Sequence, residues 1–140
     1  MNYNDLIKNL KKDFSNLKEI RIAILGDSAT QMLTKALKAY GYETGYNFNI
    51  LEADYNQIER QIFELESELY IFNPKFVIIF YCSQKLLKKF YTTNNKDKSD
   101  FSLNKINEVS NIYQNLNSNL KCKVILFNFI EINDSVFGNF

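Results

Sequence analysis

Apolar and polar residues alternate along the chain in a pattern that predicts strands separated by helices. Four apolar runs indicate strands, at residues 20–26, 47–53, 76–81 and 123–129. The runs at 20–26 and 76–81 are almost continuously apolar, which is typical of strands buried on both faces of a parallel sheet. Residues 47–53 alternate only in part, which favours a half-exposed position at the sheet edge.

Between these runs, apolar residues recur with helical spacing. Helices are predicted over residues 4–16, 29–40, 58–69, 84–91 and 103–120. Gly41 is the expected C-cap of the second helix, because glycine readily adopts the left-handed conformation that ends a helix. Pro74 closes the region of the third helix. Residues 92–100 hold no apolar side chain and are predicted to form a surface loop, with Asp100 or Ser102 as the next N-cap.

Strands that alternate with helices predict a mainly parallel sheet with helices on both faces. We therefore expect residues 1–140 to form one three-layer α/β/α domain with a flavodoxin-like sheet of about four to five strands. The expected strand order is 2-1-3-4, which places the first strand centrally. Residues 1–18 hold the N-terminal helix, and residues 130–140 form a tail.

Length and charge limit the classes of function. The 140 residues suffice for one domain with a core but not for two. The formal net charge of +1 argues against nucleic-acid or anionic-membrane binding, because both need concentrated positive potential. Two short basic clusters, Lys8–Lys12 and Lys85–Lys89, are assigned to solvated helix faces.

Features that the sequence lacks limit where the protein can be located and which catalytic mechanisms it can use. No apolar run reaches the ~20 residues of a transmembrane helix, and the N-terminus does not resemble a signal peptide. Cys82 and Cys122 fall within or beside predicted strands, so a reducing, cytoplasmic location is expected. The chain has no histidine, which excludes a Ser-His-Asp or Cys-His nucleophile pair within it and removes the commonest zinc ligand.

The residues after each predicted strand are the candidates for chemistry. They are Gly26-Asp27-Ser28, Asp54-Tyr55-Asn56, Cys82-Ser83 and Asn128. In a parallel sheet these groups converge on one edge, where ligands bind beside helix N-termini. Ser28 is a candidate nucleophile with nearby backbone N–H groups as an oxyanion hole, Asp27 could orient a partner, and Asn128 could donate to a developing oxyanion.

Each candidate also has a purely structural interpretation. Asp27 or Ser28 could be the N-cap of the following helix, because these residue types dominate N-caps. Cys82 could be a small buried apolar residue. Asn128 could satisfy backbone groups of the loop.

Two sequence patterns resemble known families. Residues 22–28 resemble the first block of SGNH (GDSL-type) hydrolases. A longer pattern, over about residues 20–140, resembles the N-terminal domain of FkbH-like proteins, the HAD-superfamily subfamily IIIC phosphatases. It comprises residues 24–28, residues 52–62, Ser67-Glu68-Leu69-Tyr70, Asn73-Pro74, Asn128-Phe129 and the tail residues Asn133-Asp134 and 136–139.

The FkbH resemblance implies an SGNH-like domain that precedes a HAD phosphatase-type domain with an Asp-x-Asp motif and magnesium. Such proteins act in glyceryl or acyl transfer to carrier proteins, in polyketide and surface-polysaccharide pathways. The expected partners are the HAD domain, in the same native chain or in another, and an acyl carrier protein. Since the sequence has no Asp-x-Asp motif, we expect it to stop where the HAD domain begins and to need no cofactor of its own.

The resemblance also implies roles for individual residues. Gly26, Asp27 and Ser28 match the SGNH nucleophile block, with Ser28 in the place of the nucleophile. Together with the other strand-end groups and the tail, the expected substrate-binding residues are Gly26, Asp54, Tyr55, Asn56, Cys82, Asn128 and Asp134. The Asp-x-x-His block is missing, and Tyr81-Cys82-Ser83-Gln84 stands where a Gly-x-Asn-Asp block would follow the third strand. Loss of a general base costs on the order of 10²–10⁴ in rate, so hydrolysis is expected to be feeble.

Three hypotheses follow. The first, which we favour, is an SGNH-like domain of an FkbH-type protein that assists transfer to a carrier protein by binding or by positioning the neighbouring domain, with weak or no hydrolysis. The second is a Ser28-dependent esterase or acyltransferase whose base is a carboxylate such as Asp134 or a group of another chain. The third is a non-catalytic interaction module. The reactivity of Ser28 distinguishes the second from the others.

Overall fold

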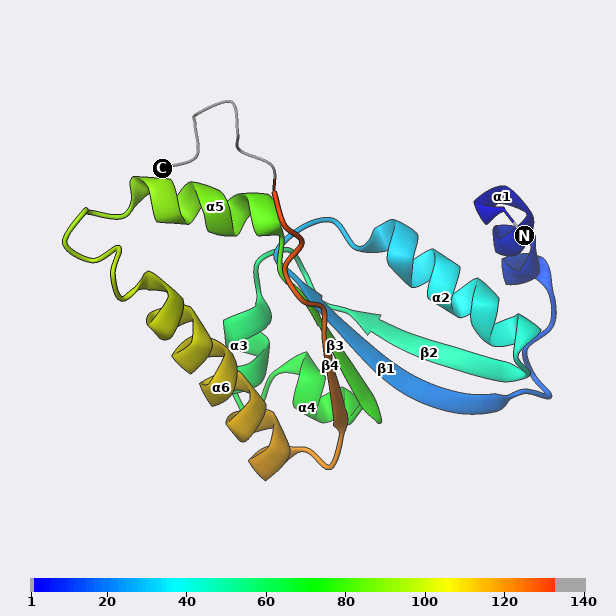
Figure 1. Cartoon of the computed structure of the whole chain (residues 1–140). Coiled ribbons are helices and arrows are strands. Elements are labelled where there is room, and N and C mark those ends of the chain that lie inside the picture. Colours follow the sequence, from blue (N-terminus) through cyan, green and yellow to red (C-terminus); the bar gives the residue numbers. More distant parts are fainter. Residues whose placement is uncertain (1, 133–140) are drawn as a thin grey trace.

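The fold is built around a parallel sheet of four strands. The computed structural model describes residues 2–132. The strands are β1 (Lys18–Gly26), β2 (Tyr46–Glu52), β3 (Phe76–Phe80) and β4 (Lys123–Leu126). They lie in the order β2-β1-β3-β4, and each neighbouring pair is parallel (Figure 1). The predicted strand order, the central position of β1 and the edge position of β2 are confirmed.

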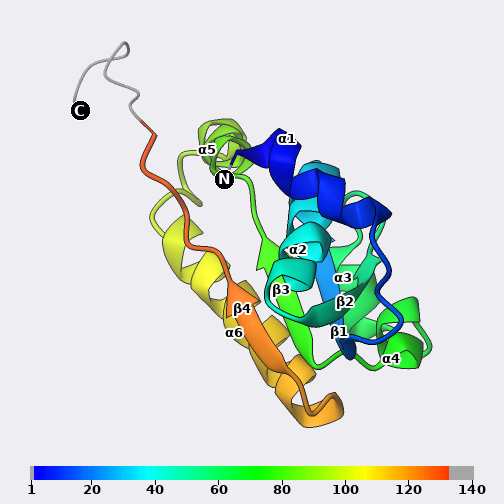
Figure 2. The same cartoon turned by 90° about the vertical axis from the view of Figure 1, so that its right-hand side faces the viewer.

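Helices cover both faces of the sheet (Figures 1 and 2). They are α1 (Tyr3–Leu6), the short 3-10 helix η1 (Ile7–Lys11), α2 (Gln31–Glu43), α3 (Ile58–Phe63), α4 (Glu68–Phe72), α5 (Ser83–Thr92) and α6 (Phe101–Asn119). α2 packs on one face through Leu37, and α3, α4 and α6 supply the helical side of a larger core on the other face. The predicted three-layer α/β/α class is confirmed.

The packing of β1 explains its nearly continuous apolar sequence. Ile22 and Ile24 belong to the cluster under α2, whereas Ala23 and Leu25 belong to the larger core with α3, α4 and α6. Because successive side chains of a strand face opposite sides of the sheet, both sets must be apolar. All four are buried, so β1 is a rigid base for the residues that follow it.

Two of the predicted helices are shorter or broken. The helix predicted over residues 4–16 ends at Lys11. The Asp13 carboxylate accepts hydrogen bonds from the backbone N–H and the hydroxyl of Ser15, both at 2.8 Å, and such local bonds compete with helix formation. The helix predicted over residues 58–69 is divided into α3 and α4, and Leu65 lies exposed in the turn between them.

Gly41 does not end a helix, which corrects the prediction from sequence. α2 continues to Glu43, and the glycine with a left-handed backbone is Gly45, at φ +80°. A Cβ atom at Gly41 would lie 2.9 Å from a ring carbon of Phe48 and 2.9 Å from the Tyr46 carbonyl oxygen. Glycine is therefore placed inside the helix because α2 lies so close to β2 there.

The last helix and the last strand are only partly buried. In α6 only Ile112 and Leu116 are buried. The exposed apolar residues of these two elements are Leu103, Ile106, Tyr113, Ile125 and Leu126. β4 also ends at Leu126, three residues before the predicted boundary at 129. The exposed apolar residues and the early end of β4 lie at the β4 edge of the sheet, where the described part of the chain has no further strand.

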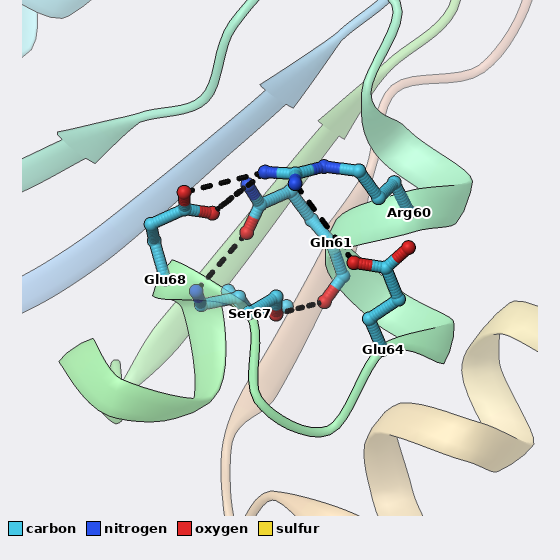
Figure 3. Close-up of polar contacts among 6 residues, drawn as sticks. Arg60, Gln61, Glu64, Ser67 and Glu68 are labelled. Carbon is cyan, nitrogen blue, oxygen red and sulfur yellow. Dashed lines mark hydrogen bonds and ion pairs between the residues drawn. The ribbon is translucent and has the colours of Figure 1, made fainter.

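A polar clasp holds the turn between α3 and α4 (Figure 3). The side chain of Gln61, which is 3% exposed, donates to the Glu68 carboxylate and accepts from the backbone N–H of Leu69 at 3.1 Å. The Ser67 hydroxyl donates to the Gln61 carbonyl at 2.6 Å, and Arg60 forms an ion pair with Glu68 at 3.0 Å. These residues carry part of the FkbH-like sequence pattern, and here they stabilise the fold.

The polar clasp is expected to make stability depend on pH. The hydrogen bond from Gln61 lowers the pKa of Glu68, so the native carboxylate stabilises the fold above the ordinary glutamate pKa. This contribution is lost as the pH falls through the native pKa. Glu68→Gln should therefore lose less stability than wild type between about pH 6 and about pH 3 in urea unfolding. Glu66→Gln, at an exposed carboxylate in the same turn, should keep the wild-type dependence, and the same behaviour in both variants would contradict the assignment.

Candidate functional site

A pocket of about 290 Å³ lies at the carboxyl ends of the strands, and we call it the strand-edge pocket. Its lining residues are Asp27, Asn56, Ile58, Glu59, Tyr81, Cys82, Lys85, Leu86, Lys89, Lys105, Glu108 and Phe129. They come from the segments that follow all four strands and from α3, α5 and α6. The sheet therefore brings distant parts of the sequence together at this edge, as the topology predicts.

Asp27 links the ends of β1 and β3. Its Oδ1 atom accepts a hydrogen bond from the backbone N–H of Cys82 at 2.8 Å, and its own N–H donates to the Phe80 carbonyl at 3.2 Å. Cys82 is in turn the N-cap residue of α5. The interpretation of Asp27 or Ser28 as the N-cap of α2 is wrong, because Thr30 occupies that position and the Asp27 carboxylate is engaged across the sheet.

Lys85 joins the ends of three strands. Its ammonium group donates to the Asp27 carbonyl and to the Tyr55 hydroxyl, and lies 4.1 Å from the centre of the Tyr55 ring. The hydrogen bond with Tyr55 raises the pKa of Lys85, so this side chain stays charged. The assignment of this basic cluster to a solvated helix face holds for Lys88 and Lys89, which are exposed, whereas Lys85 is half-buried and bonded across the strand ends. Its position in the first turn of a helix that directly follows a buried strand is the signal that could have identified it.

Tyr81 forms part of the pocket wall and is only 9% exposed. Within residues 2–132, its hydroxyl forms no hydrogen bond of good geometry, and the Glu108 carboxylate is near enough to interact with it. Lys105 lies 3.7 Å from the centre of the Tyr81 ring and forms a 2.5 Å ion pair with Glu108. Burial first, and then the nearby carboxylates of Glu108, Glu59 and Asp27, raise the pKa of Tyr81, so its hydroxyl stays protonated. From the sequence, Tyr81 is placed at the end of the third predicted strand and is given no role in the site.

Ser28 stands apart from the pocket wall. It follows Asp27 and is half-buried, but it is not one of the lining residues. Within residues 2–132, no side chain forms a hydrogen bond with its hydroxyl. Because the chain has no histidine and a serine hydroxyl is a weak nucleophile without a base, this geometry provides no activation of Ser28.

The turn after β2 contributes two of its three predicted residues. Asn56 lines the pocket with a left-handed backbone, φ +60°, and its N–H donates to the Gly26 carbonyl at 3.2 Å. Tyr55 reaches the site through Lys85. Asp54 is exposed and does not line the pocket.

The segment after β4 contributes less than predicted. Asn128 is exposed and does not line the pocket, whereas the neighbouring Phe129 does. The backbone N–H of Ile130 donates to the Ser83 hydroxyl at 2.9 Å, which ties this segment to the start of α5. Asp134 and the rest of the predicted tail, residues 133–140, lie outside the described residues.

The residues that form this fold and this pocket match a known family from residue 21 to residue 140. The family is described as FkbH, N-terminal domain. The chain belongs to this family. The resemblance seen in the sequence is thereby confirmed for this FkbH N-terminal domain. No curated protein matches it.

A solved structure agrees with the family assignment. It is the crystal structure of the N-terminal part of the protein BF1531 from Bacteroides fragilis, which contains a phosphatase domain and is complexed with Mg. The FkbH N-terminal domain resembles it with a TM-score of 0.88 and 33% sequence identity. The match covers 99% of this chain and 36% of that chain, so the FkbH N-terminal domain spans about a third of the solved relative.

Two further properties concern metals and membranes. In the part of the chain that the structure describes, no three His, Cys, Asp or Glu side chains are grouped so that they could hold a metal ion. Over the same residues, 2–132, none of the helices combines the length and the apolar character that crossing a bilayer requires.

Proposed function

We propose that this FkbH N-terminal domain binds an acyl or glyceryl group, borne by a carrier protein, in the strand-edge pocket and presents it to a phosphatase-type domain. It does not hydrolyse the bound group itself. The family and the phosphatase domain of the solved relative support a partnership with such a domain. The carrier protein and its cargo follow from the resemblance of the sequence to FkbH-like proteins.

The observation that carries this proposal is that Ser28 does not line the pocket and, among the described residues, has no hydrogen-bonded base. Asp27 and Cys82 line the pocket and are hydrogen-bonded to each other, whereas Ser28 lies outside the wall. Among the described residues, nothing hydrogen-bonds to the Ser28 hydroxyl, and hydrolysis needs an activated nucleophile. This arrangement supports a binding role for the pocket.

The lining of the pocket suits a polar group without net charge. Its charged residues are Lys85, Lys89, Lys105, Asp27, Glu59 and Glu108, so positive and negative formal charges balance. Ile58, Leu86 and Phe129 add apolar surface. The Tyr81 hydroxyl lies buried near the Glu108 carboxylate and, among the described residues, forms no hydrogen bond of good geometry. A thioester or a glyceryl group matches this mixture of apolar surface and a few placed polar groups.

Labelling with a serine-directed fluorophosphonate tests the proposal. Wild type and Ser28→Ala are incubated with the reagent and analysed by intact-mass spectrometry, with a conventional serine esterase as the positive control. We expect no adduct on either protein, because no base is hydrogen-bonded to Ser28 among the described residues. A stoichiometric adduct on wild type alone would instead establish an esterase or acyltransferase and overturn the binding role.

A further inference from the structure

A second cavity lies between α5 and α6 and continues the strand-edge pocket. It has a volume of about 220 Å³, and we call it the interhelical cleft. Four residues line both spaces, namely Leu86, Lys89, Lys105 and Glu108. Because the two spaces share part of their walls, they form one elongated site that runs from the strand ends toward the loop between α5 and α6.

The walls of the interhelical cleft come from facing sides of the two helices. Leu86, Lys89 and the C-cap residue Thr93 are three and four residues apart, so they lie on one side of α5. On α6, Phe101 lines the cleft, and its ring stands edge-on to the Phe90 ring with centroids 5.3 Å apart. Figure 1 shows α5 and α6 diverging from the loop that joins them. Aromatic packing therefore fixes the two walls at the loop end of the cleft.

Lys89 carries an uncompensated positive charge where the two spaces meet. It is exposed, and within residues 2–132 no carboxylate forms an ion pair with its ammonium group. The other charged residues shared by both spaces, Lys105 and Glu108, form an ion pair with each other at 2.5 Å and so neutralise one another. Asp97 also lines the cleft, and it is exposed in the loop.

The segment that forms the cleft is basic as a whole. Residues 83–105 hold six lysines and two aspartates, in a chain whose formal net charge is only +1. Positive charge is thus concentrated around the interhelical cleft, although the chain is nearly neutral. A cleft with an excess of one sign of charge favours a ligand group of the opposite sign, here an anion.

The two parts of the elongated site differ in depth and in charge. In the strand-edge pocket, positive and negative residues balance, and Tyr81 in its wall is only 9% exposed. The cleft ends at Asp97 and Asn104, which are both exposed. A ligand that fills both parts needs an uncharged end near the strand ends and an anionic group farther out. A carrier protein holds its acyl group as a thioester on a phosphopantetheine arm, which a phosphodiester joins to the protein, so this arm has the required order of groups.

We propose that the interhelical cleft binds the phosphopantetheine arm of the carrier protein, with Lys89 at its phosphodiester and the thioester in the strand-edge pocket. The inference rests on the function proposed above and adds the path by which the carrier-borne group reaches that pocket. An ammonium group and a phosphate oxygen form a charge-assisted hydrogen bond. Lys89 thereby distinguishes a group delivered on a phosphorylated arm from a free thioester.

Two ligands that differ by one phosphate group test the role of Lys89. Octanoyl-pantetheine and octanoyl-phosphopantetheine carry the same thioester, and isothermal titration calorimetry measures their affinities for this chain. We expect wild type to bind the phosphorylated ligand about fivefold more tightly. This preference should fall below about twofold in Lys89→Met and persist in Lys88→Met, because Lys88 is exposed on the same helix but lines neither space.

Obstruction of the interhelical cleft tests the path of the arm. Asn104 is exposed and lines the cleft, whereas Asn107 is exposed on the same helix and lines neither space. Asn104→Trp should bind octanoyl-phosphopantetheine at least about tenfold more weakly than wild type, because the indole fills the cleft. Asn107→Trp should bind as wild type does, and circular dichroism confirms folding of both variants. Equal affinities of the two variants would overturn the assignment of the cleft.

The outcomes separate this inference from the proposed function. If octanoyl-pantetheine binds and shifts the Asp27 and Cys82 amide resonances, but the phosphate adds no affinity, the pocket binds the group and the role of Lys89 is wrong. If neither ligand binds, the proposed function and this inference are both wrong. Binding to phosphatidylglycerol vesicles that is lost in Lys89→Met, without binding of the phosphorylated ligand, would assign the basic surface to a membrane and overturn the proposal.

Discussion

Replacement of Gln61 by leucine is expected to lower the free energy of unfolding by about 2–3 kcal/mol. Leucine has a similar volume, so packing is nearly conserved, but both hydrogen bonds of the side-chain amide are lost. The backbone N–H of Leu69 donates a hydrogen bond to the Gln61 side-chain oxygen at 3.1 Å. In the variant, this buried N–H is left without its partner. The Glu68 carboxylate loses its Gln61 donor and keeps Arg60. The turn between α3 and α4 should therefore open first.

Urea unfolding monitored by circular dichroism measures this loss. Gln31→Leu is a matched control, because it makes the same chemical change at an exposed position in the first turn of α2. The control should stay within about 0.5 kcal/mol of wild type. If Gln61→Leu also stays within that range, the polar clasp does not hold the turn.

Replacement of Tyr81 by phenylalanine is expected to raise the free energy of unfolding by about 1 kcal/mol, against the usual effect of a core substitution. The Tyr81 hydroxyl is buried and, within residues 2–132, forms no hydrogen bond of good geometry, so its contact with the Glu108 carboxylate replaces its bonds to water poorly. Phenylalanine removes this penalty and keeps the ring under Lys105. If the hydroxyl is retained for a ligand, the same variant should bind that ligand more weakly.

Tyr70→Phe is the matched control for this gain. The Tyr70 hydroxyl donates to the Ile62 carbonyl at 2.6 Å, so its removal should lower stability by about 1 kcal/mol. Thermal and urea unfolding of the two variants should thus shift in opposite directions. A loss of stability in Tyr81→Phe as well would show that the Tyr81 hydroxyl has a hydrogen-bond partner in solution. The hydroxyl would then not be available to bond to a ligand in the pocket.

The architecture is predictable from the sequence because periodicity reports burial directly. A strand covered on both faces must be apolar at successive positions, and the 20–26 run shows this for β1. Alternation of strands and helices then leaves few topologies. The sequence fails where a tertiary contact overrides a local signal. Glycine is common at helix ends, yet Gly41 lies inside α2, because Phe48 packs too closely there for a larger side chain.

The sequence predicts where the candidate site lies, but not all of the residues that form it. Of the strand-end residues that the sequence proposes, Asp27, Asn56 and Cys82 line the pocket. The sequence predicts a solvated position for Lys85, because basic residues on helices usually are solvated. The fold shows its bonds to two other strand ends. Nothing local in the sequence marks the Tyr81 hydroxyl as unpartnered, since that property depends on what α6 and α5 place around it.

The central claim is that the strand-edge pocket binds a group borne by a carrier protein. The most direct test titrates the isotope-labelled domain with an octanoyl-loaded acyl carrier protein and follows the amide resonances by NMR. We expect the amides of Asp27, Cys82 and Lys85 to shift or broaden, and these changes to weaken in Lys85→Met but not in Lys88→Met, which changes an exposed lysine of the same helix. Unloaded carrier should leave the pocket resonances in place. Pocket resonances that remain unchanged with loaded carrier, or change equally with unloaded carrier, would contradict the binding role.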